Sequence, residues 1–155
     1  MAVASRKVKD GTAWFGAPVR ALRPLDPVRA REELNDLASL AAQRNCARLA
    51  SLLAGETALA DFLGGVFDLS PYLRDCARNM PESLEKLFDE PLEVRILSLQ
   101  EAIRAVAFGP DASEASIMKA LRRLKREAHF LIALGDLSGE ADVEKTGQRL
   151  SRLGE

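Results

Sequence analysis

The sequence has 155 residues, of which 47% are hydrophobic and only 5% aromatic. This length suits one domain or one segment of a larger protein, and an apolar content dominated by Leu and Ala favours helix over strand. The formal net charge is −1, whereas a dedicated nucleic-acid-binding protein usually carries a strongly basic balance. A nucleic-acid role would therefore have to rest on a local basic patch.

The sequence lacks the usual signals for a metal site, a membrane span or secretion. Cys46 and Cys76 each stand alone and His129 is the only histidine, so the clustered ligands of a zinc site are missing. No apolar run approaches the ~20 residues of a membrane span, and the N-terminus lacks the apolar core of a secretory signal. We therefore expect a cytoplasmic protein with two free thiols, no metal site and no membrane association.

The first predicted helix begins after residue 25. Asp26-Pro27 combines a capping side chain with a proline at the first helical position. Asn45 is expected to interrupt this helix, and a second apolar stretch ends at Gly55. Residues 1–25 mix charge, Gly and Pro and are expected to be poorly ordered.

A short helix is predicted over residues 57–67, with Gly64-Gly65 as its weakened end. The longer helix that follows Pro91 is expected to run to about residue 108. Its predicted inner face carries Val94, Leu97, Ile103 and Val106, and further helix starts are predicted at Ser70-Pro71, Pro81, Pro91 and Ser113.

The helix capped by Ser113 is expected to run to about residue 134, with Gly135 or Gly139 as its end. A last helix is predicted over residues 140–153. No segment alternates apolar and polar residues as a half-buried strand does. The sequence therefore predicts an all-α domain over residues 26–153, with about seven or eight short-to-medium helices in an irregular bundle.

Five basic side chains fall within the eight residues 119–126. On a period of 3.6 residues, the apolar side chains of this helix form one stripe and most of the basic ones form another. The cluster is therefore the polar face of an amphipathic helix. The apolar stripe is Ile117, Leu121, Leu124, Ala128 and Leu131, and the candidate docking face is Lys119, Arg122, Arg123 and Arg126.

Three interpretations of this basic face stay open. It can be simply solvated, it can pair with an acidic surface of the same protein or of a partner, or it can bind nucleic acid. Neither Glu114 nor Glu127, four residues after Arg123, balances the charge fully. The lack of interleaved aromatic residues for base stacking disfavours nucleic acid.

Catalytic motifs are also missing from the sequence. The run Gly64-Gly65 to Ser70 superficially resembles the Gly-Gly turn, Ser and Asp-x-Asp of nucleotidyltransferases, whose aspartates hold Mg²⁺. Asp68 precedes Ser70, however, and no Asp-x-Asp occurs anywhere in the chain. The phosphate-binding, dinucleotide-binding and nucleophile-elbow motifs are absent as well. Composition and spacing alone thus predict a helical module without an active site.

Two segments nevertheless resemble a known family, the bacterial glutamine synthetase adenylyltransferases. Residues 62–88, "FLGGVFDLSPYLRDCARNMPESLEKLF", are similar to the N-terminal helical region of these enzymes, and residues 113–153 are similar to the element that follows it. Order and spacing make the resemblance specific over about residues 26–153. In the second segment it rests on Met118, Leu121, Arg122, Lys125 and Arg126, then Ile132-Ala133, and finally Leu150, Ser151 and Leu153.

The resemblance implies a much longer parent enzyme with two nucleotidyltransferase units joined by helical domains. One unit removes AMP from glutamine synthetase by phosphorolysis and the other attaches AMP from ATP with Mg²⁺, under the control of PII signalling proteins and glutamine. The family's catalytic Gly-Gly and Ser-Asp-x-Asp motif lies beyond the matching region, and this sequence stops at Glu155. No catalytic, cofactor-binding or metal-binding residue can therefore be carried over, and the chain alone is expected to be an inactive fragment.

The resemblance also suggests partners for the basic face. It would lie against the missing nucleotidyltransferase unit or near its phosphate-bearing substrate, and glutamine synthetase and PII would be further partners. The alternatives are a self-standing helical interaction module and a nucleic-acid-binding protein that uses residues 119–126. A gel shift at two salt concentrations would test the last of these, because phosphate contacts depend steeply on salt.

Overall fold

The computed structural model describes residue 14, residues 22–108 and residues 113–139. Over these residues the protein is all-α, with seven α-helices, one 3₁₀ turn and no strand, which confirms the predicted fold class. The helix predicted over residues 140–153 lies outside the described residues. The elements are α3 (Pro27–Gln43), α4 (Ala47–Ala54), α5 (Ala58–Leu69), α6 (Pro71–Asn79), α7 (Pro81–Glu85), η1 (Lys86–Phe88), α8 (Leu92–Phe108) and α9 (Glu114–Ser138).

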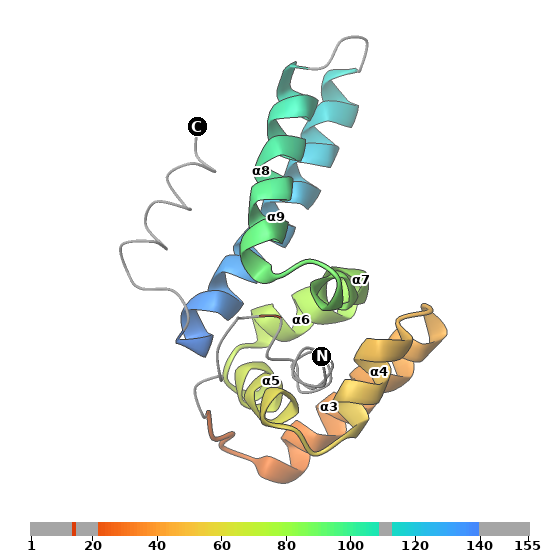
Figure 1. Ribbon diagram of the computed structural model, residues 1–155, viewed down its shortest axis with the longest axis vertical. Helices are drawn as coiled ribbons and strands as arrows, with labels where there is room; N and C mark the ends of the chain where they lie inside the picture. Colours follow the sequence, from red (N-terminus) through yellow and green to blue (C-terminus); the bar gives the residue numbers. More distant parts are fainter. Residues whose placement is uncertain (1–13, 15–21, 109–112, 140–155) are drawn as a thin grey trace, which may run out of the picture.

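The helices form a body and an arm (Figure 1). Helices α3 to α7 pack together as the body, and α8 and α9 leave it side by side as a long antiparallel pair. The second half of α9 returns to the body, where Phe130 and Leu131 are buried. We call residues 101–107 and 114–127 the outer arm, because each of them is exposed or only half-buried.

Four of the predicted helix starts are confirmed by side-chain caps, and the start at Pro81 is confirmed by α7 itself. The side chain of Asp26 accepts a hydrogen bond from the backbone N–H of Arg29 at 3.1 Å. Thr57, Ser70 and Ser113 cap α5, α6 and α9 in the same way. Each cap satisfies one of the N–H groups that the first helical turn leaves without a partner.

Two left-handed residues end helices where the sequence indicated. Asn45, at φ 63°, separates α3 from α4, as predicted. Gly139, at φ 85°, ends α9 rather than Gly135, which is buried inside the helix. Asn and Gly are the residues that adopt this conformation at the lowest cost.

The core draws on every described α-helix and on Trp14, which is fully buried. The indole ring of Trp14 meets the ring of Phe88 edge to face, with 5.2 Å between the ring centroids. The prediction of poor order for residues 1–25 falls mostly outside the described residues, but Trp14 belongs to the core. Both cysteines are free and buried, as the sequence indicated.

The prediction that Gly64-Gly65 ends a helix is wrong. Both glycines are buried inside α5, which continues to Leu69. A Cβ atom at Gly65 would lie 2.8 Å from the Cβ atom of Leu22, so the missing side chain lets the segment before α3 approach the helix closely. Asp68 holds the same segment, because its carboxylate accepts the backbone N–H of Leu25 at 2.6 Å.

The predicted inner face of α8 is wrong at two of its four positions. Val94 and Leu97 are 46% and 49% exposed, whereas Ile96 and Leu99 are buried. Ile103 and Val106 are half-buried. Helix α8 carries apolar residues on more than one side, so periodicity alone could not choose the side that meets α9.

Among the described residues, no single helix is both long and apolar enough to cross a membrane. Helices α4 and α5 reach the required length and composition only as a pair, and their axes bend by 87° at the break between them.

Candidate docking surface

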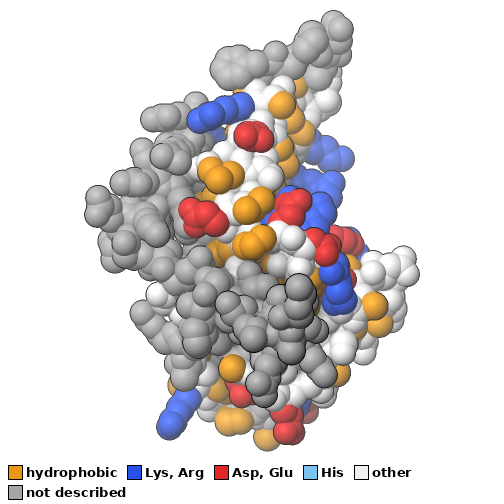
Figure 2. Space-filling view, in the orientation of Figure 1, with side chains coloured by type: hydrophobic (Ala, Val, Ile, Leu, Met, Phe, Trp, Pro, Cys, Tyr) orange, Lys and Arg blue, Asp and Glu red, His pale blue; other side chains and the backbone are white. Residues whose placement is uncertain are grey.

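The four residues of the predicted docking face lie on the outer arm. Lys119, Arg122, Arg123 and Arg126 are all exposed on α9. None of them forms an ion pair with a residue in the part of the chain that the structure describes. The described residues therefore do not supply the acidic surface that would balance this face. In the space-filling view, Lys and Arg side chains gather along one edge of the arm and down to its base, with a few acidic side chains beside them (Figure 2).

The four side chains have different neighbours. Lys119 and Arg123, one turn apart, line a groove between α8 and α9. Arg126 lies beside Tyr72 and Cys76 of α6, and its hydrogen bond with Cys76 raises the pKa of the guanidinium further above its usual value. Partial burial likewise raises the pKa of the Tyr72 phenol. Arg126 therefore contacts the body, whereas Lys119 and Arg123 are exposed along the groove.

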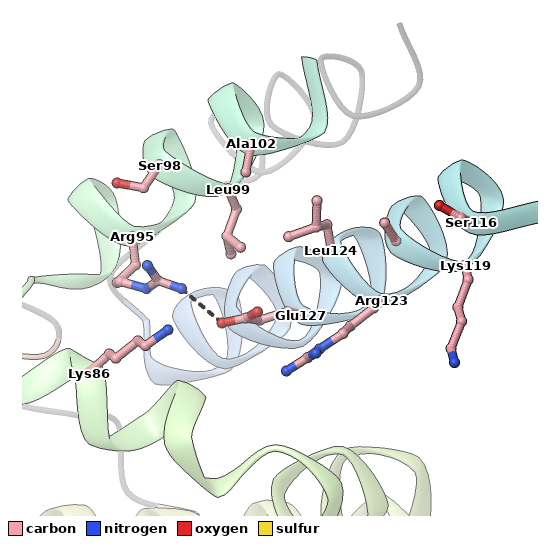
Figure 3. A pocket seen from close by; sticks show the side chains of 11 residues that line it. Lys86, Arg95, Ser98, Leu99, Ala102, Ser116, Lys119, Arg123, Leu124 and Glu127 are labelled. Atoms are coloured by element: carbon pink, nitrogen blue, oxygen red, sulfur yellow. Dashed lines mark hydrogen bonds and ion pairs between the residues drawn. The ribbon is translucent and has the colours of Figure 1, made fainter. Parts of the chain in front are cut away.

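The groove has a volume of about 640 Å³. Its floor is apolar and comes from both helices of the arm, while its basic side chains come from η1, α8 and α9. In the close-up, the side chains of Lys86, Arg95 and Glu127 point toward one another at the base of the arm (Figure 3). The groove is lined by Lys86, Arg95, Ser98, Leu99, Ala102, Ser116, Lys119, Ala120, Arg123, Leu124 and Glu127.

One buried ion pair fixes the base of the groove. Nη2 of Arg95 lies 2.9 Å from Oε1 of Glu127, and the two side chains are only 11% and 13% exposed. The hydroxyl of Ser83 donates to the same carboxylate oxygen at 2.9 Å. Glu90 approaches the other side of the guanidinium at 3.5 Å. The carboxylate of Glu127 thus binds residues of α8 and α7. It forms no ion pair with Arg123, although the spacing of four residues on α9 would allow one.

Arg95 keeps one polar atom without a hydrogen-bond partner. Its Nε is buried and unsatisfied, and the residue as a whole is only 9% exposed. A buried donor of a charged group that lacks a partner is costly. Because this atom is closed off from the surface, an occupant of the groove reaches it only if the Arg95 side chain rearranges.

A second hollow of about 340 Å³ adjoins the groove on the side of α7. It shares Lys86, Arg123 and Glu127 with the groove, so the two hollows share a border at these three side chains. The only glutamate they share is the one already paired with Arg95. Lys86 and Arg123, the two cations at this shared border, form no ion pair with the described residues.

The described residues contain no group of three or more His, Cys, Asp and Glu side chains that could hold a metal ion. What the described part of this surface does offer is charge and apolar contact. Sequence reasoning found Lys119 and Arg123 but missed Lys86, Arg95 and the pairing of Glu127. These three residues lie on separate elements, and no spacing in the sequence connects them.

Comparison with known proteins identifies the family. The family described as glutamate-ammonia ligase adenylyltransferase matches residues 61–155, which is more than half of the chain. No solved structure matches the chain in the same kind of comparison.

Several bacterial relatives carry the name bifunctional glutamine synthetase adenylyltransferase/adenylyl-removing enzyme. The protein from Mesorhizobium japonicum is 49% identical over 152 residues, which are 98% of this chain and 15% of the relative. The protein from Brucella suis is 39% identical over 142 residues, 92% of this chain and 14% of the relative. That from Rhizobium meliloti is 41% identical over 124 residues, 77% of this chain and 12% of the relative. The chain thus spans only about one seventh of the length of these relatives, and it belongs to the glutamate-ammonia ligase adenylyltransferase family.

Proposed function

We propose that this chain serves as a non-catalytic helical part of an enzyme that adenylylates glutamine synthetase and removes the adenylyl group again. The observation that carries the proposal is the 49% identity to the Mesorhizobium japonicum protein, which extends over 98% of the chain. Because the chain covers 15% of that relative, the proposal assigns both reactions to other parts of the longer enzyme.

The proposal gives the basic side chains of the outer arm a docking role. Arg122 and Arg126 would face the catalytic part of the enzyme or its phosphate-bearing substrate. Support comes from their exposure on a helix that projects from the body and from their lack of ion pairs with the described residues. Like charges on one helix face repel each other, so an anionic surface placed against them would be stabilising.

Cofactors and partners follow from the family and are part of the same proposal. ATP and Mg²⁺ would bind elsewhere in the longer enzyme, because the described residues offer no carboxylate cluster for a metal. Glutamine synthetase would be the substrate and a PII protein the regulatory partner, and the enzyme would work in the cytoplasm.

A hybrid enzyme tests the main proposal. This chain would replace the 152 matching residues of the Mesorhizobium japonicum protein, and both adenylyl transfer and adenylyl removal would be assayed on glutamine synthetase. We expect the hybrid to retain both activities, while the 155-residue chain alone shows neither. A folded hybrid without either activity, or an isolated chain with activity, would contradict the proposal.

Charge reversal in the hybrid tests the docking role. The double variant R122E/R126E is expected to lower the rate of adenylyl removal about tenfold, which corresponds to ~1.4 kcal/mol of lost interaction. The control R23E/R29E carries the same change in net charge at two exposed arginines away from the outer arm and should keep the full rate. Thermal unfolding of the 155-residue chain would show that both variants fold. An unchanged rate in R122E/R126E would reject the docking role.

A further inference from the structure

We infer that the groove between α8 and α9 binds an acidic amphipathic helix of a partner polypeptide. This goes beyond the docking role proposed for Arg122 and Arg126, which do not line the groove. The observation behind the inference is a juxtaposition: an apolar floor between two helices and a basic rim whose cations have no ion pairs with the described residues.

The basic side chains of the groove predict that its occupant is negatively charged. Lys86, Lys119 and Arg123 form no ion pair with the described residues, and the carboxylate of Glu127 is already used by Arg95 and Ser83. The chain as a whole carries 22 basic and 23 acidic side chains, so this local excess does not reflect its average composition. An anionic partner is therefore the complementary one.

The floor and walls of the groove favour a peptide over a small phosphate compound. Phosphate groups are usually held by free backbone N–H groups at a helix N-terminus. Here most of the wall is formed by the sides of α8 and α9, and Ser116, the lining residue in the first turn of α9, has its backbone N–H capped by Ser113. The floor of Leu99, Ala102 and Leu124 can instead bury apolar side chains, as in other grooves that receive an amphipathic helix.

The spacing of the rim also suits a helix. Lys119 and Arg123 are four residues apart on α9, which places them one turn apart on the same face. Carboxylates four residues apart on a partner helix would match this spacing, with its apolar side chains between α8 and α9.

The test measures binding of labelled peptides to the 155-residue chain by fluorescence anisotropy. The probe is a peptide of about four helical turns, ~15 residues, with Leu at the i, i+3, i+4 and i+7 positions and Glu at most others. One comparison peptide replaces Glu by Lys, and another keeps Glu but replaces Leu by Ser. We expect binding of the first peptide only, weakening as salt is raised.

Variants then locate the binding site. K119E/R123E is expected to weaken binding of the acidic amphipathic peptide about tenfold or more, since each reversal replaces an attraction by a repulsion. A102Q, which places a polar side chain on the floor, should weaken it without any change in charge. The control R23E/R29E should bind like the unchanged chain, because these exposed arginines lie outside the groove and outside the arm.

Four results would overturn the inference. The peptide can fail to bind at millimolar concentration, or it can bind equally well to K119E/R123E. ATP or inorganic phosphate can bind with the same sensitivity to K119E/R123E while the peptide does not, which would make the groove a phosphate site. Finally, binding can appear only after Glu140, Asp142 and Glu144 are changed to Gln, Asn and Gln, which would identify a segment of this chain as the occupant.

Peptide binding in the groove and the docking role of Arg122 and Arg126 can be rejected independently of each other. Peptide binding is measured on the chain by itself and depends on Lys119 and Arg123, whereas the docking role is measured as enzyme activity and depends on Arg122 and Arg126. Loss of activity in R122E/R126E together with normal peptide binding would leave both inferences intact. Normal activity in that variant would reject only the docking role.

Discussion

The two halves of α9 show how one continuous helix can serve two different environments. In residues 128–138, Phe130, Leu131 and Leu134 are fully buried against the body. In residues 114–127, every side chain is exposed or half-buried, and four of them are the cations of the predicted docking face. The body is therefore held by side-chain packing, whereas the outer arm presents charge to its surroundings.

The outer arm is nevertheless helical for reasons found in its sequence. The hydroxyl of Ser113 accepts the backbone N–H of Ser116 at 3.2 Å and caps α9. Leu124 and Ile103 pack against the core although they are only partly buried. A cap, one narrow apolar stripe and a continuous backbone ladder from the buried half suffice to extend a helix into solvent.

The sharpest test of this contrast compares two positions on the same helix. Phe130→Ala removes a fully buried ring and is expected to lower the free energy of unfolding by about 3–5 kcal/mol. Met118→Ala removes a side chain that is 44% exposed and should change it by no more than about 0.5 kcal/mol. Urea unfolding followed by circular dichroism measures both values.

If Phe130→Ala prevents folding, a milder substitution in the buried half of α9 keeps the comparison measurable. Ile132→Val removes a single methyl group from a residue that is 2% exposed and should cost about 0.5–1.5 kcal/mol. If Met118→Ala costs as much as Ile132→Val or more, the outer arm contributes to the core and the contrast between the two halves of α9 is broken.

The two adjacent glycines of α5 test how closely the segment before α3 packs against the body. At Gly65 a Cβ atom would lie 2.8 Å from Cβ and 3.0 Å from the carbonyl oxygen of Leu22, so Gly65→Ala forces the backbone to shift. That strain costs about 1–3 kcal/mol and outweighs the gain of up to ~1 kcal/mol in helix propensity. At Gly64 the nearest atom is a terminal methyl group of Leu34 at 3.2 Å, which can rotate away.

We therefore expect Gly65→Ala to destabilise the protein by about 1 kcal/mol or more, and Gly64→Ala to be neutral or slightly stabilising. The midpoints of urea unfolding for the two variants decide the order. If both alanines stabilise, the segment at Leu22 is not packed against α5 as closely as the structure shows.

The fold was predictable where local chemistry decides it. Asp26, Thr57, Ser70 and Ser113 are side chains that cap helices wherever they precede a helical run, and Asn45 is a residue that tolerates a left-handed backbone. Such signals act within a few residues and need no knowledge of the rest of the chain.

The interpretation of Gly64-Gly65 and of the inner face of α8 failed because tertiary contacts decide both. Gly65 is required by the approach of Leu22, which lies more than forty residues earlier in the sequence. The side of α8 that carries Ile96 and Leu99 is selected by α9, although Val94 and Leu97 are equally apolar. Local patterns contain neither contact.

Only part of the candidate site could be predicted from the sequence, because its residues come from several elements that tertiary packing brings together. Lys119 and Arg123 stand out within one segment of the sequence, whereas Lys86 and Arg95 join them only through the packing of η1 and α8 against α9. The pairing of Arg95 with Glu127 likewise joins residues 32 positions apart. A site assembled from several elements can be recognised only once those elements are placed together.

The smallest expected effect tests whether charge adds to the packing of the body. Arg48 of α4 donates hydrogen bonds to both carboxylate oxygens of Asp89 at 2.7 and 2.8 Å, and its guanidinium lies 5.2 Å from the ring centroid of Phe88. The hydrogen bond from Arg48 lowers the pKa of Asp89. The side chain of Asp89 is 66% exposed, so solvent screens the pair and its contribution to stability should be small.

The sign of the pH dependence follows from the lowered pKa. Asp89 contributes stability above the ordinary aspartate pKa of about 3.9 and loses it as the pH falls through the lower pKa of the folded state. Urea unfolding of the unchanged chain and of Asp89→Asn should therefore differ slightly at neutral pH, and the difference should vanish in acid and shrink in high salt. A difference as large as that of Phe130→Ala, or one that grows in acid, would show that charge rather than packing holds α4 against η1. The body would then depend on charge as well as on packing, and the contrast with the charged outer arm would not hold.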